Sequence, residues 1–148
     1  MNIPDQRIAI VGSRFGKLPG GGVLPEWREK ATDAARDWTR ALVASLPQSA
    51  LLVVSSEPCG VPLWALAVNR GLRPELHYRP GALGCPGRTS PELCTWPLDL
   101  ATAVYVVWDG RSRTAYRMAE RARELGRLVS FVAFSEAAPT GTNYAVST

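Results

Sequence analysis

A polar turn in the second half of the chain carries the side chains best suited to chemistry. It separates an apolar run, residues 102–108, from a helical pattern that begins near residue 114. The turn and its flanks supply guanidinium, hydroxyl, carboxylate and indole groups, on Trp108, Asp109, Gly110, Arg111, Ser112, Arg113 and Thr114. Guanidinium groups and the N–H groups at the start of a helix bind phosphate. We therefore expect this turn to bind an anionic ligand.

Roles for single residues follow from their chemistry. Ser112 is expected to cap the following helix, and Thr114 to donate its hydroxyl to the ligand or to serve in capping. Arg113, with Arg14 from an earlier turn, is expected to hold phosphate, and the alternative is that both arginines are merely solvated. Asp109 either supports the turn or accepts a hydrogen bond from a ribose hydroxyl.

Two further turns follow apolar runs and carry the other candidates. Residues 7–12 and 51–54 read as buried strands, and each run ends in small and polar side chains. The ligand-binding candidates there are Gly12, Ser13, Arg14, Ser55, Ser56 and Gly60. Glu57 is the acid best placed to act on a glycosidic bond, with Asp109 as the second catalytic candidate. The plainer interpretation of Glu57 is a loop acid at the start of a helix.

The stretch 79–97 has no regular period and is rich in proline, glycine and hydroxyl residues. A segment of this length without secondary structure is typical of a binding lid or a mobile loop. Its Trp96, like Trp108, could stack on a nucleotide base, although core packing is the commoner role for tryptophan. His77, just before the stretch, is the only histidine and is expected to be structural.

The elements that must position these turns alternate along the chain. Strands are predicted over 7–12, 51–54, 74–78, 102–108 and 128–134, and helices over 25–46, 62–70 and 114–125. This alternation predicts one α/β domain over 1–148, with a mostly parallel five-stranded sheet and helices on both faces. In the strand order 3-2-1-4-5, the three turns would meet at a crevice between strands 1 and 4. Residues 134–148 would form a mobile tail or an edge strand.

Two of the predicted helices carry further information. In 25–46 the charged residues, Arg28 among them, are expected to face away from an apolar stripe. That stripe consists of Trp27, Ala31, Ala34, Ala35, Trp38, Leu42 and Leu46. The helix 62–70 is apolar nearly all round, which predicts burial on most of its sides. In a chain of 148 residues a second covering surface would come from another subunit, so we expect a homodimer.

Charge and composition narrow the class of partner. The formal net charge is +4, which favours anionic ligands. The chain has no basic and aromatic stripe of the kind that binds single-stranded nucleic acid. The arginines of the last predicted helix are expected to form a solvated face, at Arg117, Arg121, Arg123 and Arg127.

Cysteine spacing and apolar runs predict the cellular setting. Cys59, Cys85 and Cys94 lack C-x-x-C spacing, so neither a disulfide framework nor a zinc site is expected. No apolar run has the length of a membrane span, and the first residues do not read as a signal peptide. We expect a cytoplasmic protein with no membrane partner, no metal and no cofactor.

Three segments carry a resemblance to a known group. They read RIAIVGSR, VVSSEPCGVPLWALAVNRGLRPELHY and DLATAVYVVWDGRSRTAYRMAERARELGRLVSFV. The second is similar to the pattern VVSGGARGVDxxAxxxAxxxG, and the third contains the WDGxS core of ADxVIAxWDGxSxGTxxxIxxAxxxGKPVxVI. Both patterns belong to the SLOG superfamily, which includes the LONELY GUY phosphoribohydrolases and DNA-processing protein A. The resemblance implies a Rossmann-like three-layer sandwich that binds a nucleotide or a nucleotide-derived ligand.

The match to the SLOG patterns is divergent at specific positions. Positions that agree are Gly12, Ser13, Arg14, Ser55, Gly60, Val61, Asp109, Gly110, Ser112 and Thr114. The paired glycines of the second pattern are Ser56 and Glu57 here, its aspartate is Pro62, and the glycine before Thr114 is Arg113. A glutamate repels phosphate where a glycine would let N–H groups approach it, so we expect Arg113 to compensate. The PGGxGTxxE signature that supplies the LONELY GUY catalytic glutamate is absent.

Three functions are compatible with these residues. The first is a sensor, sponge or regulatory subunit that binds an ADP-ribose-like or cyclic nucleotide ligand, and the lost glycines and missing catalytic signature favour it. The second is a nucleotide N-glycosidic hydrolase or transferase, similar to a phosphoribohydrolase, with Glu57 or Asp109 as the acid. The third and least favoured is single-stranded DNA binding, which the resemblance to DNA-processing protein A allows.

Overall fold

The computed structural model describes residues 6–13, 15, 25–54, 57–76, 98 and 100–144. Several residues singled out from the sequence lie outside this part of the chain. They are Arg14, Ser55, Ser56, His77, Cys85, Cys94, Trp96 and the rest of the stretch 79–97. The last four residues of the predicted tail, 145–148, lie outside it as well.

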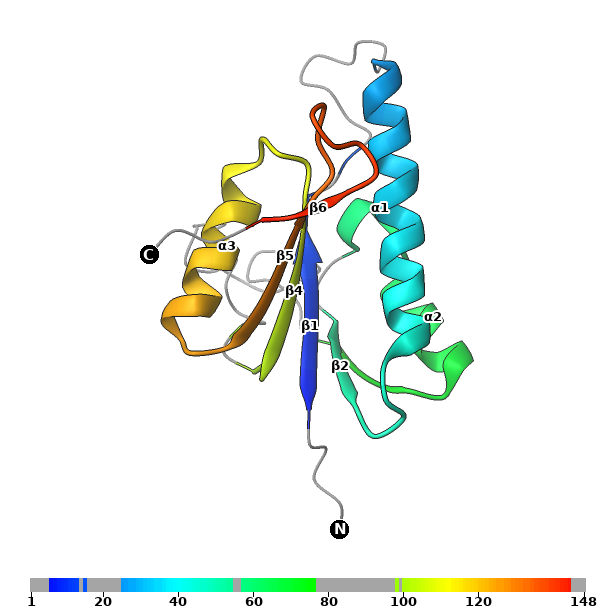
Figure 1. Ribbon diagram of the computed structural model, residues 1–148. Helices are drawn as coiled ribbons and strands as arrows, with labels where there is room; N and C mark the ends of the chain where they lie inside the picture. The colour runs from blue at the N-terminus through cyan, green and yellow to red at the C-terminus, as the bar shows by residue number, and fades with distance from the viewer. Residues whose placement is uncertain are drawn as a thin grey trace, which may run out of the picture.

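A single mixed sheet forms the centre of the described structure (Figure 1). Its strands are β1 (Arg7–Gly12), β2 (Leu51–Val54), β3 (Arg73–Leu76), β4 (Ala103–Trp108), β5 (Leu128–Ala133) and β6 (Thr142–Asn143). They lie in the order β3-β2-β1-β4-β5-β6, and all neighbours are parallel except β5 and β6. The predicted count of five strands was wrong by one, because the short antiparallel β6 extends the sheet beyond β5. This strand lies in the segment 134–148, for which an edge strand was one of the two predicted alternatives.

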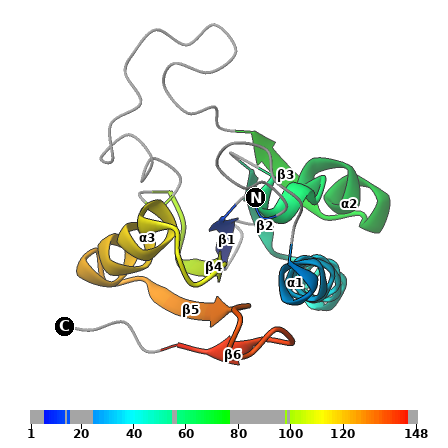
Figure 2. The same cartoon turned by 90° about the horizontal axis from the view of Figure 1, so that it is seen from above.

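Helices cover both faces of the sheet (Figure 2). Helices α1 (Glu26–Ser45) and α2 (Leu63–Arg70) and the short 3-10 helix η1 (Pro58–Gly60) lie on one face, and α3 (Arg113–Glu124) lies on the other. Strand side chains alternate between the two faces. In β1, Ile8 and Ile10 pack in the core with α1 and α2, whereas Ala9 and Val11 pack in the core with α3. The described part of the chain contains no helix with the length and apolarity needed to cross a membrane.

Two helices end where glycines in the sequence predict. At the end of α2, the N–H of Gly71 donates to Val68 O at 3.1 Å and that of Leu72 donates to Ala67 O at 2.9 Å. Gly126 and Arg127 make the same pair of bonds at the end of α3. This pattern satisfies the last helical carbonyls and requires the left-handed backbone that glycine adopts at least cost.

The buried stripe of α1 differs from the predicted one. Ala31 and Ala35 are buried as expected, and the predicted tryptophans, Trp27 and Trp38, are only partly buried beside the core. Arg28 was predicted to face solvent and is instead buried, because its guanidinium faces a carboxylate of the β4–α3 turn. The other buried positions are Thr32, Thr39 and Val43. The threonines can be buried because each donates its hydroxyl to the carbonyl four residues earlier, at 2.7 Å.

Helix α2 does not bury most of its sides, which corrects the prediction for 62–70. Only Leu63 and Ala67 are buried. The side chains of Trp64 and Val68, one turn apart, are 45% and 53% exposed. The homodimer that was inferred from this helix remains a prediction.

The chain changes direction across the sheet between β1 and β4. From β1 it passes to α1 on one face, and from β4 it passes to α3 on the opposite face. The two strands are direct neighbours, paired from Ile8↔Ala103 to Gly12↔Val107. In open α/β sheets, ligands bind beyond the carboxyl ends of strands at such a switch point.

Candidate functional site

Ser13 connects the turns that follow three neighbouring strands. Its N–H donates to Val107 O at 2.8 Å, its carbonyl accepts from Cys59 N at 2.9 Å, and its Oγ accepts from Asp109 N at 3.1 Å. The residue is only 4% exposed. The turns after β1, β2 and β4 therefore lie together at the carboxyl ends of their strands, as the sequence predicted for the three segments.

Gly12 is required for the close approach of β1 and β4. A Cβ atom at this position would lie 2.0 Å from the backbone oxygen of Val107, a distance that no side chain tolerates. Gly12 therefore allows β1 and β4 to pack at this distance because it has no side chain. Contact between Gly12 and a ligand stays a prediction.

Asp109 holds the β4–α3 turn with both of its carboxylate oxygens. Its Oδ1 accepts from the N–H groups of Arg111 and Ser112, at 2.9 and 2.8 Å. Its Oδ2 lies 3.7 Å from Nη2 of Arg28 in α1, and the two side chains are 12% and 7% exposed. The turn-supporting role suggested for Asp109 is confirmed by these contacts. Gly110 lies in the same turn, where a side chain would meet Ser135 Cβ at 2.9 Å.

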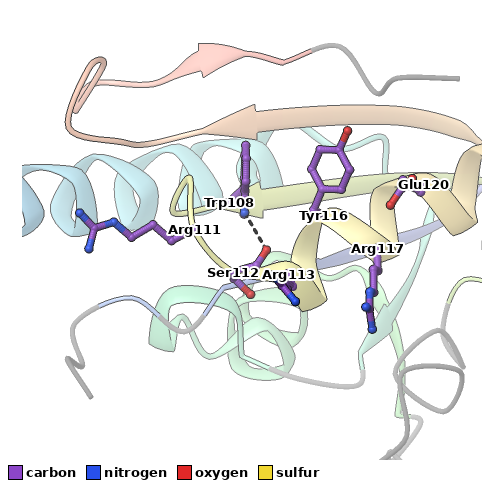
Figure 3. A pocket seen from close by; sticks show the side chains of 7 residues that line it. All are labelled: Trp108, Arg111, Ser112, Arg113, Tyr116, Arg117 and Glu120. Atoms are coloured by element: carbon purple, nitrogen blue, oxygen red, sulfur yellow. Dashed lines mark hydrogen bonds between the residues drawn. The ribbon is translucent and has the colours of Figure 1, made fainter. Parts of the chain in front are cut away.

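Ser112 caps α3, as predicted. Its Oγ accepts a hydrogen bond from Ala115 N at 3.4 Å, and its carbonyl accepts from Nε1 of Trp108 at 2.9 Å (Figure 3). The N–H groups of Arg113 and Thr114 donate to no acceptor within the described residues. They are therefore available to an anion at the positive end of the helix dipole.

Arg111 contacts Trp27, the residue that precedes Arg28 in α1. Its guanidinium carbon lies 5.5 Å from the ring centroid of Trp27, within the range of a cation–π interaction. Trp27 and Arg28, in the first turn of α1, thus contact Arg111 and Asp109 of the β4–α3 turn. Neither contact was predicted, because helical spacing placed Arg28 away from the apolar stripe of this helix.

Trp108 belongs to an aromatic cluster on the α3 side of the sheet. Its ring centroid lies 5.1 Å from that of Phe131, 5.1 Å from that of Tyr144 and 5.6 Å from that of Tyr116. The indole remains half-buried and also borders a pocket. Stacking of this ring on a base stays a prediction.

The remaining described candidates have exposed side chains or backbone. They are Glu57, Gly60, Arg111, Arg113 and Thr114. Glu57 precedes η1, and Gly60 ends it, so both belong to the turn that contacts Ser13 through Cys59. Thr114 follows Arg113 in the first turn of α3. Their exposure leaves them accessible to a ligand, and their roles stay predictions.

A pocket of about 300 Å³ opens along the start of α3 (Figure 3). Its lining contains four predicted ligand-binding residues and three that were not predicted: Trp108, Arg111, Ser112, Arg113, Tyr116, Arg117 and Glu120. Arg117 had been assigned to a solvated helix face. The signal that could have identified the three additional residues is their spacing, because residues 116, 117 and 120 lie three, four and seven positions after Arg113 and therefore face the same side of a helix.

Cys59 is a buried free thiol behind the site. Burial raises its pKa, and this effect is opposed in part by a hydrogen bond with Thr39 and by the charges of Arg36 and Arg40. The Thr39 Oγ1 and Cys59 Sγ atoms lie 3.7 Å apart, and Arg36 Nε donates to Cys59 O at 2.9 Å. A protonated thiol in this setting has a packing role. No cluster of three or more acids, histidines and cysteines suited to a metal ion occurs among the described residues.

Comparison of the chain with protein-family models, with curated proteins and with solved structures returns no match. What the site binds is therefore inferred from its own residues and contacts. Two properties matter most: the convergence of three turns at Ser13, and the arginines around the start of α3.

Proposed function

We propose that this protein binds a nucleotide or a nucleotide-derived ligand, such as an ADP-ribose-like molecule or a cyclic nucleotide. The ligand lies at the carboxyl ends of β1, β2 and β4, and the protein acts as a sensor, sponge or regulatory subunit. The observation that carries this proposal is the set of three hydrogen bonds of Ser13, which brings the three turns together at the switch point of the sheet.

The chemistry at the start of α3 favours a phosphate group. The N–H groups of Arg113 and Thr114 donate to no acceptor in the described part of the chain, and they lie at the positive end of a 12-residue helix. Exposed guanidinium groups flank them on Arg111 and Arg113. Oriented amides and arginines together are the usual ligands of protein-bound phosphate.

Binding is favoured over catalysis by the contacts of Asp109. Both of its carboxylate oxygens already have partners within the protein, on Arg28, Arg111 and Ser112. A carboxylate held in this way fixes the turn and is poorly placed to transfer a proton to a substrate. Of the two catalytic candidates, Glu57 and Asp109, only Glu57 then stays a candidate acid.

A thermal-shift screen of the full chain tests the proposal. The panel contains nucleoside monophosphates and diphosphates, ADP-ribose and cyclic nucleotides. A true ligand at about 100 times its Kd stabilises the folded state by about 2.7 kcal/mol, which raises Tm by several degrees. The proposal is overturned if no compound of the panel shifts Tm.

Variants of α3 locate the binding. Arg113→Gln should abolish the Tm shift, because it removes a phosphate ligand at the start of the helix. Arg121→Gln is the matched control, since it makes the same charge change on the same helix outside the pocket. Release of free base from the ligand, lost in Glu57→Gln, would instead assign N-glycosidic cleavage to the site.

A further inference from the structure

Two arginines of α3 line the pocket at neighbouring positions on the helix. Arg113 and Arg117 are separated by one helical turn, and both line the pocket. No ion pair in the described part of the chain includes either residue. By contrast, Arg121 one turn further on pairs with Glu124 at 3.3 Å. Like charges at this spacing repel, so an arginine pair that forms no ion pair with a described acid favours anionic groups on this wall of the pocket.

The opposite end of the pocket has a different chemistry. Glu120 lies two turns beyond Arg113, a rise of about 10.5 Å along the helix. It forms no ion pair with any described residue. Figure 3 shows Tyr116 extending from α3 toward β5, Arg117 extending away from β5, and Glu120 further along the helix. The pocket therefore has a cationic end at the start of α3 and an anionic end beside a phenol ring.

We propose that this pocket selects a ligand with two adjacent phosphates and a hydrogen-bond donor at its other end, which is the chemistry of a nucleoside diphosphate. The inference rests on the proposed function and specifies its ligand class. One phosphate binds Arg113 and the N–H groups at the start of α3, and the second binds Arg117. Glu120 accepts from a hydroxyl or amino group of the nucleoside.

The spacing of the two arginines selects a diphosphate over a single phosphate. Four residues of helix separate them by a rise of about 6 Å, and each guanidinium holds one phosphate through two parallel hydrogen bonds. A single phosphate at Arg113 leaves Arg117 without a partner. Glu120 repels phosphate and attracts donors, so it also fixes which end of the ligand enters at the start of α3.

Calorimetric titration of the full chain with ADP, AMP and inorganic pyrophosphate tests the assignment. The wild type should bind ADP about tenfold more tightly than AMP, since one charge-assisted pair accounts for such a difference. Arg117→Gln should bring ADP affinity down to that of AMP and leave AMP affinity unchanged. Arg121→Gln should keep the wild-type preference. Equal affinities for ADP and AMP in the wild type, or equal behaviour of the two variants, would overturn the assignment.

Glu120→Gln gives a second readout with opposite signs for two probes. Removing the negative charge should weaken ADP binding, because a neutral amide oxygen is a weaker acceptor for the nucleoside than a carboxylate, and should strengthen pyrophosphate binding slightly. A change of the same sign for both probes overturns the role of Glu120. Arg117 is exposed and Glu120 is half-buried at the pocket wall, and neither belongs to a core cluster, so neither substitution is expected to prevent folding.

The two proposals fail in distinguishable ways. Pyrophosphate binding that depends on Arg117, without tighter binding of any nucleotide, supports the diphosphate pocket and overturns nucleotide binding. Nucleotide-induced stabilisation that Arg117→Gln and Arg121→Gln leave equally intact supports the proposed function and overturns the diphosphate pocket.

Discussion

The guanidinium of Arg28 lies 3.7 Å from the carboxylate of Asp109, and both side chains are almost entirely buried. This ion pair joins the first turn of α1 to the turn that starts α3. Asp109 in turn accepts from the N–H groups of Arg111 and Ser112, so the pair sets the direction in which α3 begins. The proposed phosphate site thus depends on a residue of α1 that contacts no proposed ligand atom.

Loss of the buried ion pair should be costly. Arg28→Ala leaves the Asp109 carboxylate without its buried counter-charge, and we expect the free energy of unfolding to fall by about 3 kcal/mol. Arg40→Ala is the matched control, because it removes an exposed Arg–Asp pair of similar length, 3.8 Å, from the same helix. The control should lose less than about 0.5 kcal/mol in urea titrations. Equal losses in the two variants would contradict the importance of the pair.

Ser13 should contribute to stability through a single oxygen atom. Ser13→Ala leaves the N–H of Asp109 without its acceptor, and we expect a loss of about 1 to 3 kcal/mol in the free energy of unfolding. Ser45→Ala removes an exposed serine hydroxyl that donates to Leu42 O, and should have little effect. Chemical denaturation of both variants measures the difference. A neutral Ser13→Ala substitution would show that the convergence of the turns does not depend on this bond.

The raised pKa of Cys59 makes a prediction about alkaline stability. The thiol is neutral in both states at pH 7, and the unfolded thiol ionises near its ordinary value of 9.0 while the folded one stays protonated to higher pH. The stability that this difference provides is complete below the unfolded pKa and is lost as pH rises through the folded pKa. Cys59→Ala should therefore lose less stability than the wild type as pH rises through and above the ordinary thiol pKa of 9.0. If the free energy of unfolding had the same pH dependence in both proteins, the raised pKa of Cys59 would be refuted.

The exposed face of α2 predicts self-association. Trp64 and Val68 are 45% and 53% exposed, and we predict that a second copy of the chain covers them. Sedimentation equilibrium should show a dimer, and Trp64→Asp should raise its dissociation constant by about thirtyfold or more. Leu128→Asp alters another exposed apolar residue on β5, 73% exposed, and should leave the dimer intact. A monomeric wild type, or equal effects of the two substitutions, would rule out this interface.

Local patterns in the sequence predicted most of the elements. Periodicity and capping rules identify features that are visible in a few consecutive residues. These include the apolar runs of β1, β2, β4 and β5 and the glycines that end α2 and α3. The strand β6 has only two residues, and it forms because Asn143 and Thr142 pair with β5. A strand this short depends on tertiary contacts, so the sequence offered an edge strand in 134–148 only as one of two alternatives.

The sequence predicted those site residues that directly follow a strand or begin a helix. It did not predict those whose role depends on a partner far away in the sequence. Ser13, Asp109 and Ser112 were identified because they end apolar runs or start a helix. Arg28 was missed because helical periodicity assigns every charged residue to solvent, while its partner lies on another element. Arg117 was missed for the same reason, although it shares a side of α3 with Arg113.

The most direct test of nucleotide binding is a crystal structure with the tightest ligand of the thermal-shift panel. We predict density at the carboxyl ends of β1, β2 and β4, with a phosphate in contact with the N–H groups of Arg113 and Thr114. Density for the ligand on another surface, such as the outer face of α2, would contradict the proposed site.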